Sequence, residues 1–231
     1  MKTKVFKASM AVILMLYFFL PQMPAYGINE KVDRKDVRQI NQFIKKETKK
    51  LTKDGFRAEV GAPGIEWQLR QSFEKQLMSD EEGNNLFVVG VGSAVSGIQN
   101  VARRHAASDA QIDACTQLES KIMGLIETDY NNRLYSRNEF ETLSRMKGVF
   151  SNLLAQTLPI GTPICTFYKD NGKYYDFQIR IAYSSRMMAE RSKMVISEIL
   201  SKENDELRKK FERITGLDRL GSAESNNVPE E

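Results

Sequence analysis

Side chains that commonly carry out chemistry are few in this sequence. His105 is the single histidine among 231 residues, and the cysteines are Cys115 and Cys165. A Ser-His or Cys-His catalytic pair would therefore have to use His105, and a metal site built from several histidines is excluded. The cysteines lack the close spacing of a metal site. We interpret His105 as a residue at the edge of a helix stripe with a satisfied hydrogen bond.

A short glycine motif, Gly90-Val91-Gly92, lies between an apolar run and a helical pattern, as nucleotide-binding loops do. A dinucleotide-binding loop needs a third glycine at position 95, which is Val95, and a P-loop needs Gly-Lys followed by Ser or Thr. Neither pattern is present. We therefore expect these glycines to allow a helix to pack closely against a strand.

Carboxylates are numerous but scattered along the chain. Glu119 is the one acid within the apolar stripe of a predicted long helix, where it either pairs with a buried base or lies at the rim of the stripe. A carboxylate pair of the glycosidase type cannot be recognised without geometry. We predict no enzyme, no catalytic or metal-binding residues and no cofactor, and the ligand-binding residues stay unassigned.

Residues 1–27 have the pattern of a cleavable export signal. Three lysines stand within the first seven residues, and an apolar run from Ala8 to Leu20 follows them. The triplet Ala25-Tyr26-Gly27 suits cleavage after Gly27. The run is shorter than the roughly 20 residues that span a bilayer, so we predict a periplasmic or extracellular protein without a transmembrane segment after cleavage.

Cleavage would also change the charge of the chain. Lys2, Lys4 and Lys7 are the only charged residues of the signal, so the formal net charge falls from +4 to +1. A net charge near zero gives no reason to expect nucleic acid binding. No cysteine follows the apolar run, and this excludes lipid attachment by that route.

Residues 28–83 are predicted to form an N-terminal helical extension. The first helix, within residues 28–53, has a basic end formed by Lys45, Lys46, Lys49 and Lys50. This end either contacts an anionic lipid or polymer or is a solvated helix face, and we favour the solvated face. A second helix runs from Ile65 to Leu77 because apolar residues repeat every four positions. It carries Trp67, which we interpret as a packing anchor.

Residues 84–200 are predicted to form the main domain. A strand within 86–91 leads into a long helix over about 98–130, in which alanines at 106, 107, 110 and 114 permit close approach. A second helix is expected over about 139–157, capped by Asn138 with Glu141. A final helix is expected from Arg186 to about Thr215. Its part beyond residue 200 forms, with the tail to residue 231, a projecting charged helix and a disordered end.

Two strands, 164–168 and 174–183, are predicted to form a hairpin around Asn171-Gly172, the favoured pair of a type I′ turn. That turn places Tyr168 opposite Tyr175 and Ile164 opposite Ile179, with one face of the hairpin buried and the other wet. Cys165 then points away from the apolar face, whereas Cys115 faces the core. We therefore predict that both cysteines are free.

These elements predict an α+β fold. It would have a small, mostly antiparallel sheet of about three strands in the order strand-helix-helix-hairpin-helix, with helices on one face. The sequence blocks Val89–Ser93 (VGVGS), Asn100–Ala110 (NVARRHAASDA) and Tyr174–Tyr183 (YYDFQIRIAY) carry a family resemblance. Over roughly residues 84–200 the chain resembles the LPP-twenty lipoprotein family of bacterial envelopes, which is akin to FlgO-like proteins.

The resemblance implies an envelope protein without established catalytic residues. We therefore expect a non-catalytic module that binds an envelope protein or polymer and has no nucleic acid partner. The alternative is a module for a small ligand or glycan in the periplasm, using Trp67 or the hairpin tyrosines beside the sheet.

Overall fold

The computed structural model describes residues 34–80, 83–132, 135–147, 149–200 and 209. The predicted export signal lies outside these ranges, as do the predicted charged tail and almost all of the last helix beyond residue 200. Within the described part of the chain, every helix is too short or too polar to cross a bilayer.

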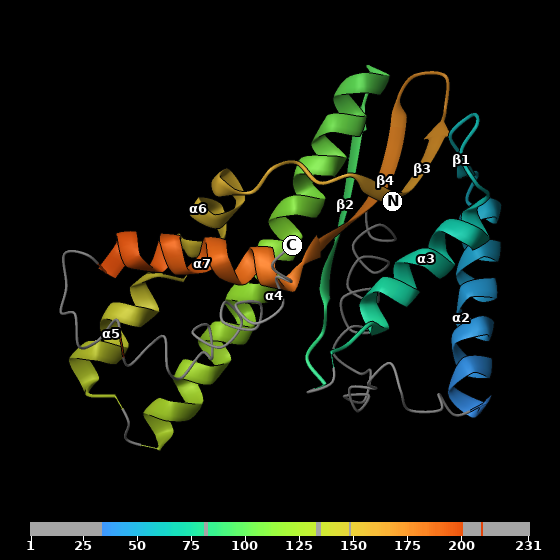
Figure 1. Ribbon diagram of the computed structural model, residues 1–231. Helices are drawn as coiled ribbons and strands as arrows, with labels where there is room; N and C mark the ends of the chain where they lie inside the picture. The colour runs from blue at the N-terminus through green and yellow to red at the C-terminus, as the bar shows by residue number, and fades with distance from the viewer. Residues whose placement is uncertain (1–33, 81–82, 133–134, 148, 201–208, 210–231) are drawn as a thin grey trace, which may run out of the picture.

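A four-stranded antiparallel sheet forms the centre of the molecule (Figure 1). In chain order its strands are β1 (Arg57–Ala58), β2 (Phe87–Ser96), β3 (Pro163–Asp170) and β4 (Tyr175–Ser184). They lie side by side in the order β1-β3-β4-β2. The predicted α+β class is confirmed, with one strand more than the three expected, because Arg57 pairs with Tyr168 at the end of β3.

Six helices surround the sheet within the described ranges. They are α2 (Arg34–Lys53), α3 (Ile65–Leu77), α4 (Gln99–Asn131), α5 (Arg137–Arg145), α6 (Phe150–Thr157) and α7 (Ser185–Leu200). α4 confirms the predicted long helix, and α3 begins and ends where the periodicity predicts.

The single helix predicted over 139–157 is instead two helices, α5 and α6. Ser136, and not Asn138, caps α5: the Ser136 hydroxyl accepts from the Glu139 N–H, and the Glu139 carboxylate accepts from the Ser136 N–H at 2.6 Å. This reciprocal pair satisfies two backbone donors, which Asn138 with Glu141 would do two residues too late. The N–H groups of Met146, Lys147 and Val149 donate to carbonyls three residues earlier, as in a tight turn and not an α-helix. The first helix therefore ends before Phe150, where the second begins.

One face of the sheet, here called the first face, is covered by α4. The buried residues of α4 include Ala102, Ala106, Ala110 and Ala114, and they pack on the inward side chains of β4. A Cβ atom on Gly90 would lie 1.9 Å from the Ala110 carbonyl oxygen, and one on Gly92 would lie 2.1 Å from that of Ala106. The prediction that these glycines allow close helix–strand packing is confirmed.

The opposite face, here called the second face, is covered by α3, and α2 packs on the outside of α3 (Figure 1). The expectation of helices on one face was therefore wrong. A second core forms there from Ile44, Leu51, Phe56, Ile65, Leu69, Cys165 and Phe167. The sequence of β4 did not predict this packing, because Asp176, Gln178 and Arg180 on that side are polar and were expected to face water. In the structure all three are half-buried.

The hairpin is present, but its turn lies one residue later than predicted. Asn171 N–H donates to the Tyr174 carbonyl at 3.1 Å, so Gly172 and Lys173 are the central residues. Gly172 has φ +76°, as the first central position of a primed turn requires. Tyr168 therefore pairs with Phe177 and not with Tyr175. Moving the turn by one residue shifts the pairing by two, so the side chains from Cys165 to Asp170 stay on their predicted faces.

A bulge changes the start of β3. Pro163 pairs with Ile181 and Cys165 with Arg180, so Ile164 is the extra residue and packs against the second core. The predicted pairing of Ile164 with Ile179 was therefore wrong. Beyond the sheet, α5, α6 and α7 form a helical lobe around the second half of α4 (Figure 1).

Candidate functional site

The residues singled out from the sequence do not come together in one place. Trp67 is 53% exposed on the outer side of α3, so its interpretation as a packing anchor was wrong. His105 is exposed on α4, and Glu119 is buried in the same helix. Among the described residues no three His, Cys, Asp or Glu side chains are grouped as metal ligands would be.

A row of polar residues on α4 runs along the outer edge of β2. Asp109 and Asp113 accept hydrogen bonds from Ser93 N–H at 3.1 Å and Val91 N–H at 2.9 Å, and Gln117 donates to the Val89 carbonyl at 3.1 Å. These side chains take the place of a neighbouring strand, so the edge of the sheet is closed to pairing. Their spacing of four residues is the signal in the sequence that could have revealed this row, and we did not predict it.

Asp113 lies in this row and is half-buried. Burial raises the pKa of the Asp113 carboxyl, and Asp109 nearby raises it further, whereas hydrogen bonds from Val91 and Gln117 act in the opposite direction. Asp113 was not a sequence candidate. Its contacts are with the protein backbone and Gln117, so they support a structural role.

The two cysteines lie on opposite faces of the sheet, as the hairpin pattern predicted. Cys115 belongs to the first core and Cys165 to the second, and both are free. Burial raises the pKa of the Cys115 thiol to about 12 and that of the Cys165 thiol to about 11. Both therefore carry very little of the thiolate that a nucleophile needs at neutral pH.

Between the second face and α3 lies a polar network. The Gln68 side chain donates to the Pro63 carbonyl at 2.6 Å and accepts from Thr166 N–H at 2.7 Å. The Cys165 thiol donates to the Gln68 carbonyl at 3.0 Å. Because each of these groups has a partner inside the protein, the network joins α3 to β3 and offers little to a ligand.

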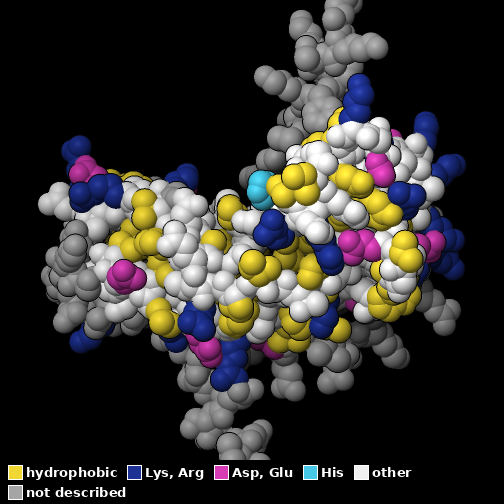
Figure 2. All heavy atoms as spheres, turned by 90° about the horizontal axis from the view of Figure 1, so that it is seen from above, with side chains coloured by type: hydrophobic (Ala, Val, Ile, Leu, Met, Phe, Trp, Pro, Cys, Tyr) yellow, Lys and Arg dark blue, Asp and Glu magenta, His cyan; other side chains and the backbone are white. Residues whose placement is uncertain are grey.

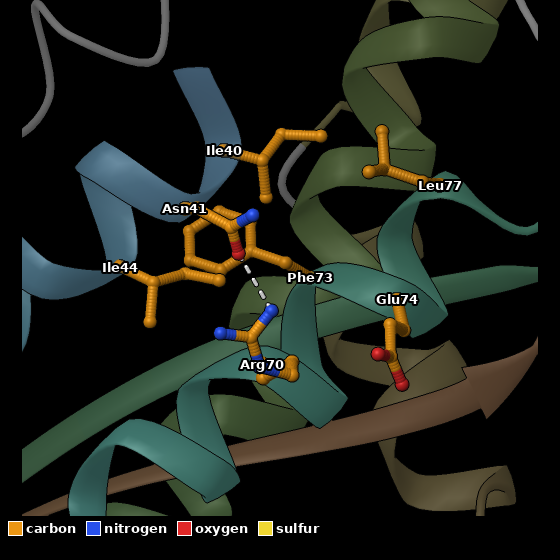
Figure 3. Close-up of a pocket in the computed structure, with 7 residues that line it drawn as sticks. All are labelled: Ile40, Asn41, Ile44, Arg70, Phe73, Glu74 and Leu77. Carbon is orange, nitrogen blue, oxygen red and sulfur yellow. Dashed lines mark hydrogen bonds between the residues drawn. The ribbon is translucent and has the colours of Figure 1, made fainter. Parts of the chain in front are cut away.

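A hollow of about 180 Å³ lies between α2 and α3 (Figure 3). Ile40, Ile44, Phe73 and Leu77 give it apolar walls. Arg70 at its side donates to the Asn41 amide oxygen at 2.7 Å. A second hollow of about 150 Å³ lies between α5 and α7. Sites for drug-sized ligands occupy about 300–1,000 Å³, so each hollow suits a single partner side chain better than a whole small molecule.

A third feature is the end of the molecule that contains the β3–β4 turn and the start of α4. Four apolar side chains are exposed there, and we call them the hairpin-end surface: Val60 (98%), Ile98 (64%), Val95 (55%) and Tyr174 (43%). The pairing of Ser96 with Tyr175 brings Val95 and Tyr174 to this end. A salt bridge of 3.3 Å from Arg103 to Glu59 brings Val60 towards α4.

Seen from above, this end of the molecule shows hydrophobic side chains among basic and acidic ones (Figure 2). The hairpin-end surface combines elements that are distant in sequence, namely the β1–α3 loop, the β2–α4 corner and the hairpin turn. Sequence reasoning missed this surface because its residues come from separate segments, and no local sequence pattern connects them.

Comparison with known proteins adds no relative. No family model, curated protein or solved structure matches this chain.

Proposed function

We propose that this chain is an exported, non-catalytic protein of the bacterial cell envelope that binds another protein through the hairpin-end surface. The export pattern of residues 1–27 and the resemblance to the LPP-twenty family support the location. The exposure of Val95, Ile98, Tyr174 and Val60 at one end carries the proposal for binding.

Exposed apolar side chains that are held in place by regular backbone structure are well placed to bind a protein partner. Burying apolar surface contributes about 25 cal/mol per Å², and less of this gain is lost to the ordering of side chains and loops when the contact residues are already ordered. Val95 belongs to a strand paired along its full length, and Tyr174 follows a turn closed by a backbone hydrogen bond. The surface therefore needs little rearrangement before a partner binds.

The surroundings of the hairpin-end surface fit the usual anatomy of an interface. Lys173, Asp170 and the Arg103–Glu59 pair provide charged groups around the apolar centre. Interfaces place apolar and aromatic residues at the centre and polar residues at the rim. The alternative of a small-ligand or glycan module has less support, because the two hollows described above are small.

Site-specific photo-crosslinking in cells tests the proposal. A photoreactive amino acid replaces Ile98 or Tyr174, and a matched control places it at Met194, which is 58% exposed on α7. Mass spectrometry of the envelope fraction then identifies the adducts. We expect one repeated protein adduct from Ile98 and Tyr174 and none of it from Met194.

The same experiment also measures how much one contact contributes, through the yield of the adduct. With the photoreactive group at Tyr174, the substitution Ile98→Ser should lower the adduct yield about tenfold, as expected when a central contact worth about 1.4 kcal/mol is lost. The proposal fails if Met194 gives the same adduct, or if the protein is recovered without any partner. Adducts to glycans would favour the ligand-binding alternative.

A further inference from the structure

The outer side of α2 carries a row of cations. We call it the lysine face, and it consists of Arg38, Lys45, Lys46, Lys49, Lys50 and Lys53, all of them exposed. At 100° per residue these six positions fall within roughly 140° of the helix circumference. Ile40, Ile44 and Leu51 lie on the other side, where α2 packs on α3.

No member of the lysine face has a carboxylate within 4 Å among the described residues. Among the acids whose side chains are described, Glu47 and Asp54 are nearest in sequence, and both positions fall outside this arc of the helix. Like charges one turn apart destabilise a helix about as much as opposite charges stabilise it. The lysine face therefore does not contribute to folding through ion pairs.

Three other helices each hold one arginine in an ion pair with a glutamate of the same helix. Each of three pairs joins an arginine to a glutamate one turn away: Arg70 to Glu66 on α3, Arg137 to Glu141 on α5 and Arg186 to Glu190 on α7. A merely solvated α2 could use the same arrangement. What distinguishes the lysine face is that six exposed cations share one arc of a single helix, and none of them is paired with an acid in the described part of α2.

We propose that the lysine face binds the anionic headgroups of a membrane surface. α2 has 20 residues, about 30 Å in length, and lies outermost in the molecule, so its cations can reach a flat array of phosphates together (Figure 1). Basic residues near an anionic bilayer each contribute to adsorption, and their effects add.

An aromatic side chain favours a bilayer over another polyanion. Phe43 borders the lysine face and is 43% exposed, and its ring is held against Phe73 with centroids 5.2 Å apart. A bilayer interface accepts an aromatic ring beside the headgroups. The membrane's location rests on the proposed export, but the binding surface is separate from the hairpin-end surface.

Vesicle binding tests this inference on protein purified after expression of the full chain. Vesicles of phosphatidylcholine with about one third phosphatidylglycerol are compared with phosphatidylcholine alone, at low salt and at about 0.5 M salt. The quadruple variant K45Q/K46Q/K49Q/K50Q should lose at least about 100-fold in binding to the anionic vesicles. The control R104Q/K121Q/R145Q/K147Q removes four exposed charges elsewhere and should bind nearly as well as the wild type.

A local probe identifies which surface touches the vesicle. Since Cys115 and Cys165 are buried, an environment-sensitive dye can be attached to Gln42→Cys at the centre of the lysine face, or to Met194→Cys as a control. With anionic vesicles, the emission of the dye at position 42 should shift and that at position 194 should not.

Three results would overturn the inference: equal binding to both kinds of vesicle, an equal loss in the control variant, or tighter binding to duplex DNA that the quadruple variant abolishes. The last result would make the lysine face a nucleic acid surface. Photo-crosslinking from Tyr174 should persist in the quadruple variant, so failure of either proposal leaves the other open to its own test.

Discussion

The two faces of the sheet are packed in different ways. On the first face, the backbone of α4 lies directly against β2, because glycines and alanines stand at the contact. On the second face, α3 is joined to the sheet by side chains, among them Gln68, the half-buried Arg180 and the fully buried Ser72. One contact depends on the size of the residues and the other on hydrogen bonds.

This difference determines what each face tolerates. A backbone-to-backbone contact has no side chain that can move aside, so added volume must displace the whole helix. A polar network tolerates small shifts but not the loss of a partner, because the group left behind is buried and unsatisfied. Substitutions on the two faces should therefore destabilise the fold for different reasons.

The largest effect is expected at the first face. Gly90→Ala places a methyl group 1.9 Å from the Ala110 carbonyl oxygen, and we expect the free energy of unfolding to fall by more than about 3 kcal/mol. Urea denaturation measures the change, with circular dichroism reporting whether the variant folds at all. Gly92→Ala should behave similarly.

Gly124→Ala is the matched control, since this glycine lies within α4 and a Cβ there meets nothing within 4 Å. It should stabilise the protein by up to about 1 kcal/mol, because alanine is the better helix former. If Gly90→Ala were as well tolerated as Gly124→Ala, the close contact between α4 and β2 would be refuted.

The same contrast explains which parts of the fold could be predicted. The glycine and alanine positions of the first face indicate close packing directly, since no other residue type would fit. The alternation in β4 likewise gives the correct faces, even with the turn misplaced by one residue, because a shift of two in the pairing preserves the alternation.

The second face could not be predicted because Gln178 and Arg180 have the composition of a wet surface. Only the position of α3 shows that its side chains contact and satisfy groups on that side of the sheet. The hairpin-end surface could not be predicted for a related reason: strand pairing and a salt bridge bring its segments to one end of the molecule, and neither follows from local sequence.

At the second face, Gln68→Leu should lower the free energy of unfolding by about 2–3 kcal/mol. The substitution removes the acceptor for Thr166 N–H and the donor to the Pro63 carbonyl, and leaves buried groups unsatisfied. Gln71→Leu is the control on the same helix, where the amide bonds only to the exposed Glu74. Equal losses in the two variants would show that the network contributes nothing specific.

A smaller effect is expected where α4 meets the edge of β2. Asp113→Ala leaves Val91 N–H without its acceptor and should cost about 1–2 kcal/mol in the free energy of unfolding. Asp113→Asn keeps an acceptor and should cost less. Because burial raises the folded pKa of Asp113 above 3.8, the folded state keeps a proton that the unfolded state loses.

The contribution of Asp113 to stability should therefore fall as pH rises from about 4 through its folded pKa. Asp113→Asn removes this dependence, and urea denaturation at several pH values measures it. A variant that retains the wild-type pH profile would show that another group is responsible.

The two thiols give the finest comparison between the faces. Burial raises the pKa of the thiol to about 12 for Cys115 and to about 11 for Cys165, so both thiols are almost entirely protonated at about pH 8. Because both thiols are buried and mostly protonated, iodoacetamide should modify each of them slowly in the native protein, with both rates rising as pH rises. Because both folded pKa values lie above the unfolded value of 9.0, the thiols stabilise the fold fully below pH 9, and this contribution is lost as pH rises towards 11 and 12. Mass spectrometry of the alkylated peptides gives the two rates separately. Rapid modification of Cys115 would mean that α4 separates readily from the sheet, and rapid modification of Cys165 would mean the same of α3.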